Sequence, residues 1–262
     1  MRLHVSAWSA WAPGVESPEA WRQWAESDAP GLAGAGIPAA GAAPTATPAL
    51  PHLDAMFKRR LSQLSRMVLH VGHELAAGRE IATVFASRHG EISQQYKISQ
   101  NLIQEGEVKP AAFSLSVFNT PVALLSIAEK NHQRGSALDG GAASFTTALL
   151  EAAALTRRSA GDVLLLCGDE SLPEAWQALA GLPLPPHALG LLVSASASPG
   201  CVGLEITAEG GLSEDWQAAG PGPTAAGLAQ PLRFLAWFLS GCPGELRLAH
   251  RGFGLALRGV GP

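Results

Sequence analysis

Short apolar runs alternate along the chain with segments of helical periodicity, and this alternation constrains the fold more than any other feature. Residues 81–86 and 162–167 are apolar runs of strand length. The apolar positions of residues 53–77 instead recur every three or four residues, which is typical of a helix with one buried face. Strands that alternate with helices favour an α/β fold. We therefore predict an α/β protein whose mixed, mostly parallel sheet is covered by helices, with some antiparallel pairing late in the chain.

The same patterns predict the remaining elements. Ser17-Pro18-Glu19 supplies a helix N-cap, a proline at the first helical position and an acidic first turn. Further helices are expected at residues 18–26, 91–104, 119–131, 141–158 and 224–239. Further strands are expected at residues 3–12, 188–196, 201–207, 245–249 and 253–258. The Ser198-Pro199-Gly200 turn predicts that the strands on either side of it pair with each other.

Residues 27–51 interrupt this order, because they consist almost entirely of alanine, glycine, proline and threonine. Such a stretch cannot bury enough apolar surface to order itself, so it predicts a mobile insert. The chain has 262 residues, of which 47% are hydrophobic, and this is enough to bury a substantial core. We expect a single domain over residues 1–262 that carries the low-complexity insert.

Charge and cysteine usage argue against several classes of protein. Only 15% of the residues are charged and the formal net charge is −4, so the chain lacks the basic field of a general nucleic-acid binder. Cys167, Cys201 and Cys242 are widely spaced, which favours a reducing compartment over a disulfide framework or a zinc knuckle. The N-terminus lacks the apolar region of a signal peptide, and the densest apolar run, residues 232–239, is too short to span a membrane. The sequence predicts a cytoplasmic protein without membrane insertion.

The common catalytic signatures are mostly missing from the sequence. It contains no GxSxG nucleophile elbow, no HExxH motif and no Walker A phosphate loop. His70 and His73, with Glu74, lie one helical turn apart, an arrangement in which two imidazoles can face a metal. The sequence implies no third ligand nearby, and histidines on the rim of an amphipathic helix are more often plain surface residues. We therefore predict no metal site and no cofactor.

Lys58, Arg59, Arg60 and Arg66 form the basic cluster of the sequence. Such a cluster is usually a solvated helix face, and on charge alone this is the better interpretation. The sharper interpretation is a docking patch, because clustered cations steer acidic partners. Arg59 and Arg60 face different directions on a helix, so not all four cations can contribute to one patch.

Polar side chains gather where predicted strands end and helices begin. Arg88 and His89 follow the strand at residues 81–86, a position that often lines a site in α/β folds. Ser116 and Asn119 lie near predicted helix starts. Each of these side chains can line a site or cap a helix, and their spacing identifies no Ser-His-Asp set.

Three segments, taken in order, carry a family resemblance. Residues 57–75 (FKRRLSQLSRMVLHVGHEL), 114–126 (SLSVFNTPVALLS) and 136–168 (SALDGGAASFTTALLEAAALTRRSAGDVLLLCG) resemble the basic early helix, an asparagine-containing segment and the nucleophile turn of the β-ketoacyl synthase family. The motifs SAWAPG, FASRHGE, AFSLSV and GDESLP are similar to stand-alone ketosynthase-like N-terminal-domain proteins. Those proteins are described as chain-length-factor-like and are associated with aryl-polyene or fatty-acid-type pathways. The resemblance implies a thiolase-like half-fold.

The resemblance also locates the position of the nucleophile. Active condensing enzymes carry a cysteine about 23 residues after the asparagine of the second segment, at a strand-to-helix turn. Counting from Asn119 gives Ala142, and a methyl group cannot accept an acyl chain. The nearest cysteine, Cys167, falls in a predicted buried strand and is interpreted as a small core residue. The family's two later histidines, one in an HGTGT-like motif, have no counterpart, since neither His187 nor His250 has matching neighbours.

Ser144 and Asp139 flank this turn and are the weak candidates for a replacement. A serine needs a base, and none is evident nearby, so capping of the next helix is the simpler role. The resemblance thus implies a catalytically inactive, chain-length-factor-like accessory subunit of fatty-acid, polyketide or aryl-polyene biosynthesis. Its expected partners are a ketosynthase, an acyl carrier protein or a second copy of itself. Condensing enzymes present cations to acidic carrier proteins. The resemblance therefore makes a docking patch as well supported as a solvated helix face for the basic cluster.

Two alternative functions stay open. An unconventional acyltransferase would use a non-cysteine nucleophile such as Ser144 or Ser116. A structural or regulatory module would act without a carrier protein. A half-fold is expected to expose the face that normally meets its second half, so a large exposed apolar patch would favour a partner.

Overall fold

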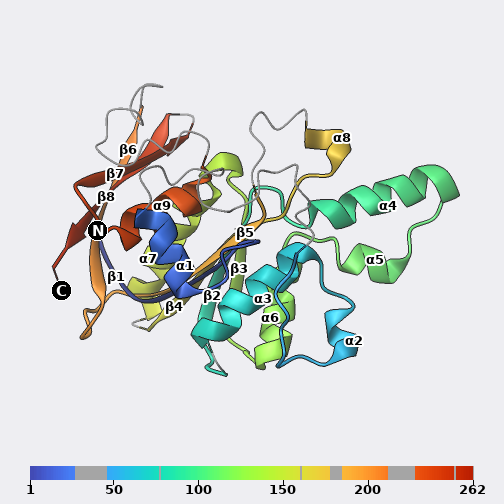
Figure 1. Ribbon diagram of the computed structural model, residues 1–262, viewed down its shortest axis with the longest axis horizontal. Coiled ribbons are helices and arrows are strands. Elements are labelled where there is room, and N and C mark those ends of the chain that lie inside the picture. Colours follow the sequence, from blue (N-terminus) through green and yellow to red (C-terminus); the bar gives the residue numbers. More distant parts are fainter. Residues whose placement is uncertain are drawn as a thin grey trace.

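An eight-stranded mixed sheet with the strand order β3-β2-β4-β5-β1-β6-β8-β7 forms the centre of the fold (Figure 1). The computed structural model describes residues 1–26, 46–76, 78–159, 161–177, 185–211, 228–250 and 252–261. The strands are β1 (Arg2–Trp11), β2 (Ala82–Ala86), β3 (Gly135–Leu138), β4 (Val163–Asp169), β5 (His187–Ser194), β6 (Val202–Gly210), β7 (Glu245–His250) and β8 (Phe253–Val260). The helices are α1 (Pro18–Glu26), α2 (Ala55–Lys58), α3 (Gln63–Ala76), α4 (Ile92–Glu105), α5 (Pro110–Ser114), α6 (Thr120–Glu129), α7 (Ser144–Ser159), α8 (Glu174–Gln177) and α9 (Gln230–Leu239). The predicted α/β class is confirmed.

The short elements are those that the sequence did not predict. Strand β3 and helices α5 and α8 have four or five residues each, which is too few to show a periodicity. Most of the predicted insert, residues 27–45, and the start of the predicted helix at 224–239 lie outside the described residues.

The expectation of a mostly parallel sheet is wrong. Strand β2 is parallel to β3 and β4, whereas the other paired neighbours, from β4 through β5, β1, β6 and β8 to β7, are antiparallel. Apolar strands that alternate with helices typically make parallel pairs, but strand direction depends on the connection that follows each strand. Parallel pairing is therefore confined to the β3-β2-β4 end of the sheet, whereas the antiparallel pairing predicted late in the chain is confirmed between β6, β8 and β7.

Strands β5 and β6 do not pair with each other, so the predicted hairpin is also wrong. The turn itself is present, since the Cys201 N–H donates to the Ser198 carbonyl at 3.1 Å. Strand β1 lies between the two strands and pairs with both, in register Trp8 with Leu191 and Leu3 with Leu204. A local turn signal shows that the chain reverses but not whether a distant strand inserts between its arms.

The helix predicted over residues 53–77 is two helices. The Asp54 carboxylate accepts the Phe57 N–H at 2.8 Å and begins α2. The Ser62 hydroxyl accepts the Ser65 N–H at 2.8 Å and begins α3. This second cap starts a new helix where the apolar periodicity alone indicated continuity.

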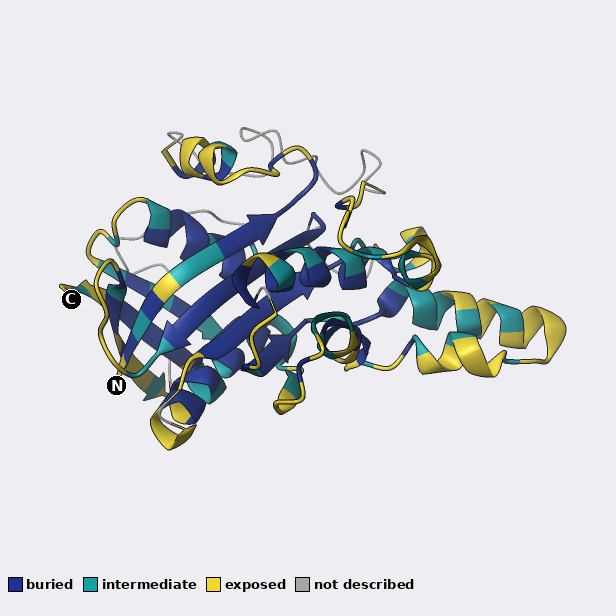
Figure 2. Cartoon of the chain, turned by 90° about the horizontal axis from the view of Figure 1, so that it is seen from below, coloured by how far each residue is buried: buried dark blue, intermediate teal, exposed yellow. Residues whose placement is uncertain are grey.

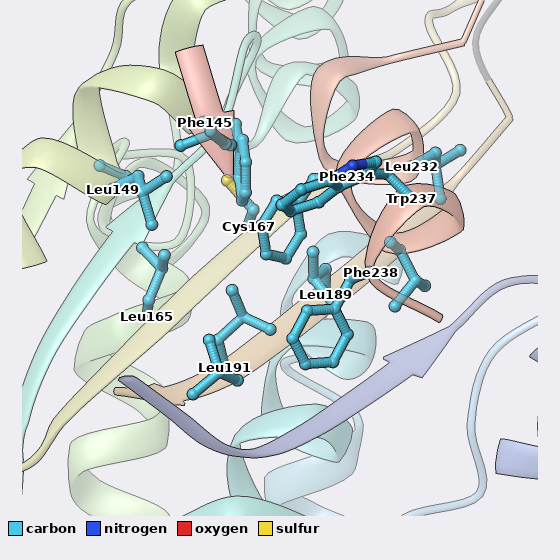
Figure 3. Close-up of a cluster of buried hydrophobic side chains, with 14 of the residues drawn as sticks. Phe145, Leu149, Leu165, Cys167, Leu189, Leu191, Leu232, Phe234, Trp237 and Phe238 are labelled. Carbon is cyan, nitrogen blue, oxygen red and sulfur yellow. The ribbon is translucent and has the colours of Figure 1, made fainter. Parts of the chain in front are cut away.

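Helices cover both faces of the sheet. On one face, α7 packs against β4 and β5, α9 against β5 and β7, and α1 against β1 and α9. Phe145, Phe234 and Trp237 lie at the centre of this core (Figure 3). On the other face, α3 and α6 pack on the sheet, with Met67 and Val68 in a second core. The ends of β2 and β4 are thus held from both sides.

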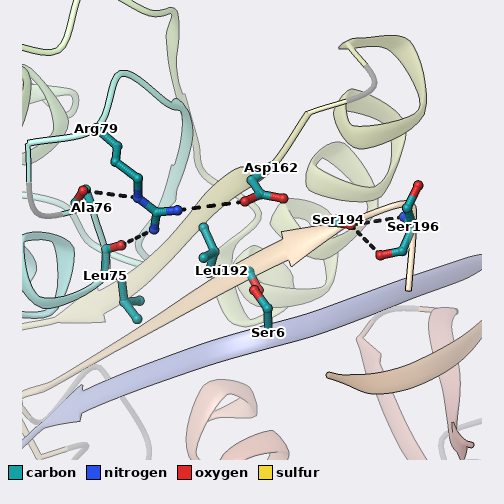
Figure 4. Close-up of polar contacts among 8 residues, drawn as sticks. All are labelled: Ser6, Leu75, Ala76, Arg79, Asp162, Leu192, Ser194 and Ser196. Carbon is teal, nitrogen blue, oxygen red and sulfur yellow. Dashed lines mark hydrogen bonds and ion pairs between the residues drawn. The ribbon is translucent and has the colours of Figure 1, made fainter. Parts of the chain in front are cut away.

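The C-terminus of α3 is capped by an arginine (Figure 4). The Arg79 guanidinium donates to the Ala76 carbonyl at 3.3 Å and to the Leu75 carbonyl at 2.5 Å, and it lies 3.9 Å from the Asp162 carboxylate. A cation at this end satisfies carbonyls that have no helical partner. A hollow of about 460 Å³ beside Arg79 is lined largely by serines and small residues.

Helices α4 and α5 form an arm that projects from the sheet and is largely exposed (Figure 2). Ile92 is the one buried residue of α4, and α5 has none. The arm and the residues that follow it expose the large apolar side chains of Leu102, Ile103, Phe113 and Val117. Within the described residues, no helix has the length and apolar character needed to cross a membrane.

Candidate functional site

A pocket of about 230 Å³ lies where the carboxyl ends of β2 and β4 meet the turn before α7. The start of α9 and the end of β7 complete its wall among the described residues. The predicted nucleophile position, Ala142, lies in this wall together with Arg88, Ser144, Cys167 and His250. A site at the carboxyl ends of parallel strands is a common arrangement in α/β folds.

Ala142 lies in a 3₁₀ turn, Gly141–Ala143, that connects β3 to α7. Gly141 has φ +57°, a left-handed conformation that side chains rarely adopt, which explains the glycine. The exposed Asp139 carboxylate accepts the Gly141 N–H at 2.8 Å and so holds the turn. The strand-to-helix turn expected around Ala142 is therefore present, with a methyl group facing the pocket.

The Ser144 hydroxyl is held by backbone groups of this turn. It lies 2.8 Å from the carbonyls of Ser87 and Gly141, and it accepts the Gly140 N–H at 3.0 Å. Ser144 is 5% exposed, and no described imidazole or carboxylate hydrogen-bonds its hydroxyl. Ser144 joins the turn to the end of β2, which is a structural role close to the predicted cap.

Asp169 organises the loop that follows β2. One carboxylate oxygen, Oδ1, accepts the Ser87 hydroxyl at 2.8 Å, the Arg88 N–H at 2.7 Å and the His89 N–H at 3.2 Å. The Ser87 hydroxyl in turn accepts the Gly90 N–H at 2.8 Å. Sequence reasoning quoted the motif GDESLP but did not identify Asp169 as a site residue. Three donors on one oxygen make this loop a rigid wall of the pocket.

Cys167 lines the pocket from the middle of the core. It is 2% exposed, and burial together with the nearby Asp169 carboxylate raises the pKa of its thiol well above the usual value. The thiolate is the nucleophilic form of cysteine, so this thiol is unreactive at neutral pH. The interpretation of Cys167 as a core residue agrees with its placement in β4.

Two buried carboxyl groups lie behind the loop that Asp169 holds. Glu91 accepts the Ser65 hydroxyl at 2.5 Å, and burial, opposed by hydrogen bonds from Ser62 and Ser65, raises its pKa to about 7. Glu170 accepts the Ser93 N–H at 2.8 Å, and burial raises its pKa also. Glu91 thus ties the start of α4 to α3, and Glu170, which follows β4, ties it to the end of that strand.

The structure separates the four predicted site-lining residues. Arg88 lines the pocket, and His89 follows it with a pKa that burial lowers. Ser116 is buried and donates to the Phe113 carbonyl at 2.9 Å, whereas Asn119 is exposed at the start of α6 and makes no side-chain cap bond. Neither Ser116 nor Asn119 is among the residues of the pocket wall.

The C-terminal part of the chain contributes residues that sequence reasoning did not place at the site. His250 at the end of β7 and Gln230 and Arg233 of α9 line the pocket. The neighbours of His250 in the sequence match no catalytic motif, so no local signal marks it as a site residue. Only the pairing of β7 with β8, and of β8 with the rest of the sheet, brings it near Ala142.

The four residues of the basic cluster do not share one continuous helix, because they extend from the end of α2 into α3. Lys58 ends α2, and Arg59 and Arg60 are exposed in the break before α3. The Arg66 guanidinium donates to the Lys58 carbonyl at 2.7 Å, so it ties the two helices together. None of these four cations has an ion-pair partner among the described residues.

His70 and His73 do not face one another. His70 Nε2 lies 3.4 Å from Glu74 Oε1 on the same helix, whereas His73 Nδ1 lies 2.7 Å from Glu129 Oε1 on α6. The pair of imidazoles considered from the sequence therefore makes two separate contacts.

Comparisons with known proteins now identify the fold. The family model of the β-ketoacyl synthase N-terminal domain matches residues 21–245. A structure of the ketosynthase ApeO in complex with its chain length factor ApeC, from Xenorhabdus doucetiae, is similar with 28% identity and a TM-score of 0.77, over 98% of this chain and 99% of that one. The ishigamide ketosynthase/chain length factor is similar at 14% identity and a TM-score of 0.73, over 100% of both chains. No curated protein matches this chain.

A third structure, a type II polyketide synthase acyl carrier protein in complex with its ketosynthase bound to the hexaketide, matches at 9% identity and a TM-score of 0.71, over 100% of this chain and 99% of that one. At such identities the likeness concerns the fold alone. It agrees with the mixed sheet and helical layers described above, and the predicted thiolase-like half-fold is confirmed. The family match covers most of the chain, and the protein belongs to the family of β-ketoacyl synthase N-terminal domains.

Proposed function

We propose that this protein is a catalytically inactive, chain-length-factor-like subunit that acts by pairing with a ketosynthase. The observation that carries the proposal is the pocket wall, in which Ala142 occupies the turn where a condensing enzyme needs its nucleophile. Condensation begins with transfer of an acyl group to a thiolate, and a methyl group cannot accept it.

The other candidate nucleophiles of the pocket are unsuited to acyl transfer. The Ser144 hydroxyl is engaged by three backbone groups, and its contacts include no base. The Cys167 thiol is buried and protonated. An acyltransferase therefore finds no activated nucleophile among these residues, and the accessory role is the better supported function.

The exposed arm supports a partner. Ile103 is 84% exposed and Phe113 is 59% exposed, although side chains of this kind are normally buried. Strand β3 forms one edge of the sheet and leads directly into the Ala142 turn. An edge strand offers unpaired backbone groups to another chain, so a partner on this edge would lie next to the pocket. The similar Xenorhabdus structure contains a ketosynthase together with its chain length factor, which supports a ketosynthase as that partner.

We further propose that the basic cluster docks an acyl carrier protein. Lys58, Arg59 and Arg60 lie at the surface without ion-pair partners in the described part of the chain, and such cations attract acidic partners.

We also propose that the protein acts in the cytoplasm, because its three cysteines are free thiols and suit a reducing compartment.

Co-expression with the ketosynthase of the native host tests the pairing. A stable complex that elongates acyl chains, together with an unchanged intact mass of this chain after exposure to acyl-thioester donors, is the expected result. A stable acyl adduct on this chain would overturn the assignment as inactive. A chain that purifies alone, or only as a homodimer, would overturn the ketosynthase partner.

Charge reversal tests the docking of the carrier protein. The double variant Lys58→Glu/Arg60→Glu is expected to weaken carrier binding about tenfold at low salt and to flatten its salt dependence. Arg157→Glu on the last turn of α7 is the matched control, and it should leave the affinity unchanged. Equal affinity and equal salt dependence for the double variant and the wild type would refute the docking surface.

A further inference from the structure

Three metal-ligating side chains from separate segments meet beside α3 and α6. His52 precedes α2, His73 lies in the last turn of α3, and Glu129 is the last residue of α6. One ligand atom from each residue, a ring nitrogen of each histidine and a carboxylate oxygen, lies within 4.8 Å of the other two. The tertiary fold assembles this cluster, because no local spacing relates the three residues.

The two imidazoles are stacked. Their ring centroids are 3.5 Å apart and the ring planes differ by 10°. The stacking therefore holds two nitrogen donors next to each other. A neutral imidazole keeps one nitrogen lone pair, which is the form that binds a metal.

A backbone hydrogen bond orients the carboxylate of Glu129. Its Oε2 accepts the Gly78 N–H at 3.1 Å, while its Oε1 lies 2.7 Å from His73 Nδ1. The Glu129 side chain is 6% exposed and the His73 side chain is 37% exposed. One carboxylate oxygen is therefore oriented toward the histidines, and solvent reaches the cluster from the histidine side.

We propose that His52, His73 and Glu129 bind a divalent transition metal ion of the zinc class. Two imidazole nitrogens and one carboxylate oxygen suit Zn²⁺, whereas Mg²⁺ and Ca²⁺ prefer sites made of oxygen atoms. Tetrahedral zinc bonds of about 2.1 Å place neighbouring ligand atoms about 3.4 Å apart. Metal binding would replace the 2.7 Å contact between His73 Nδ1 and Glu129 Oε1 and would rotate the exposed His52 and half-buried His73 side chains to this spacing, with water in the fourth position.

Such an ion would join the segment before α2 to α3 and α6. Binding to the folded chain alone would stabilise it by RT ln(1 + [M]/Kd), where [M] is the free metal concentration, so the unfolding temperature would rise with the logarithm of [M] once [M] exceeds Kd. The cluster shares no residue with the pocket around Ala142. The proposal therefore does not depend on the accessory role proposed above, and either can fail without the other.

Calorimetric titration of the full chain, without an affinity tag and stripped with a chelator, tests the site. Zinc chloride is expected to bind with one ion per chain and to raise the unfolding temperature, whereas magnesium chloride does neither. Loss of a residue that only orients a metal ligand already costs about tenfold or more in metal affinity, so His52→Ala, His73→Ala and Glu129→Gln should each weaken binding by at least this factor.

His70→Ala is the matched control. His70 lies one turn before His73 on the same helix, but its imidazole contacts Glu74 and is outside the proposed ligand set. This variant should keep the wild-type zinc affinity within about twofold, since no ligand is removed. Circular dichroism of each stripped variant confirms that it is folded. Absence of zinc binding to the wild type, full affinity in the folded His52→Ala and His73→Ala variants, or an equal loss in His70→Ala would overturn the proposed site.

Discussion

The pocket beside Ala142 and the arm formed by α4 and α5 have opposite chemical character. In the pocket, the polar side chains of Ser144 and Asp169 are engaged by backbone groups, and the reactive position carries a methyl group. On the arm, large apolar side chains are exposed to solvent. The pocket wall thus presents no activated nucleophile among its described residues, whereas the arm presents apolar surface that another protein can contact. This contrast is what a subunit that works by contact requires.

The largest expected effect is a loss of affinity for the ketosynthase when the apolar surface of the arm is removed. The double variant Ile103→Asp/Phe113→Asp removes two exposed apolar side chains from the proposed interface. Burial of two such side chains contributes about 4 kcal/mol, so the Kd for the ketosynthase should rise roughly a thousandfold. Surface plasmon resonance on the purified pair measures this change.

Phe253→Asp is the matched control, because Phe253 is 36% exposed at the start of β8, a strand near the sheet edge opposite β3. It should leave the Kd unchanged, and both variants should keep the wild-type circular dichroism spectrum. Equal binding by the arm variant and the wild type would exclude the arm from the interface.

A smaller effect concerns the buried acid behind the pocket. Burial raises the pKa of Glu91 to about 7 from an ordinary value of 4.5, so between these pH values the folded chain keeps a proton that the unfolded chain has lost. This contribution to stability is complete below pH 4.5 and is lost as the pH rises through 7, a change of about 3 kcal/mol. Urea unfolding at pH 5 and pH 8 measures it.

Glu91→Gln keeps a neutral side chain at both pH values and should remove most of this decline. Glu107→Gln, an exposed position between α4 and α5, is the control and should keep the wild-type difference. Glu170 is buried with a raised pKa and adds a change of the same sign in every variant. An undiminished decline in Glu91→Gln would show that Glu91 is ionised in the folded chain at pH 5.

The smallest effect concerns the turn itself. Ser144→Ala leaves the Gly140 N–H without its side-chain partner and should lower the free energy of unfolding by about 1–2 kcal/mol. Thr147→Ala, which removes a bond to the Ala143 carbonyl on the half-buried side of α7, should cost less than half as much. Equal stability of Ser144→Ala and the wild type would refute the structural role of this hydroxyl. The same variant also removes the alternative nucleophile, so unchanged complex activity would support the accessory role.

The local elements of the fold were predictable because their signals are local. The Ser17-Pro18 cap marked the start of α1, and apolar runs marked β2 and β4. Ala142 was found on a turn of the expected kind, since a family pattern in the neighbouring sequence located it. The break at Ser62 was not predicted, because a capping hydroxyl inside an apolar periodicity resembles any other polar helix residue.

The arrangement of these elements was less predictable. Insertion of β1 between β5 and β6 depends on hydrogen bonds between residues nearly two hundred positions apart, such as Trp8 and Leu191. The pairing of β8 with β6, and of β7 with β8, brings His250 to the pocket. Neither periodicity nor turn signals carry information about such contacts.

By itself, the sequence determined most of the longer helices and strands, that the chain resembles condensing enzymes, and that alanine stands where the resemblance places the nucleophile. These properties follow from residue chemistry and from hydrogen bonds to near neighbours. The tertiary structure alone decided the order and direction of the strands, the composition of the pocket wall, and the meeting of His52, His73 and Glu129. The physical reason is that strand pairing and side-chain convergence are set by packing between distant segments, which optimises the whole core rather than any one stretch of the chain.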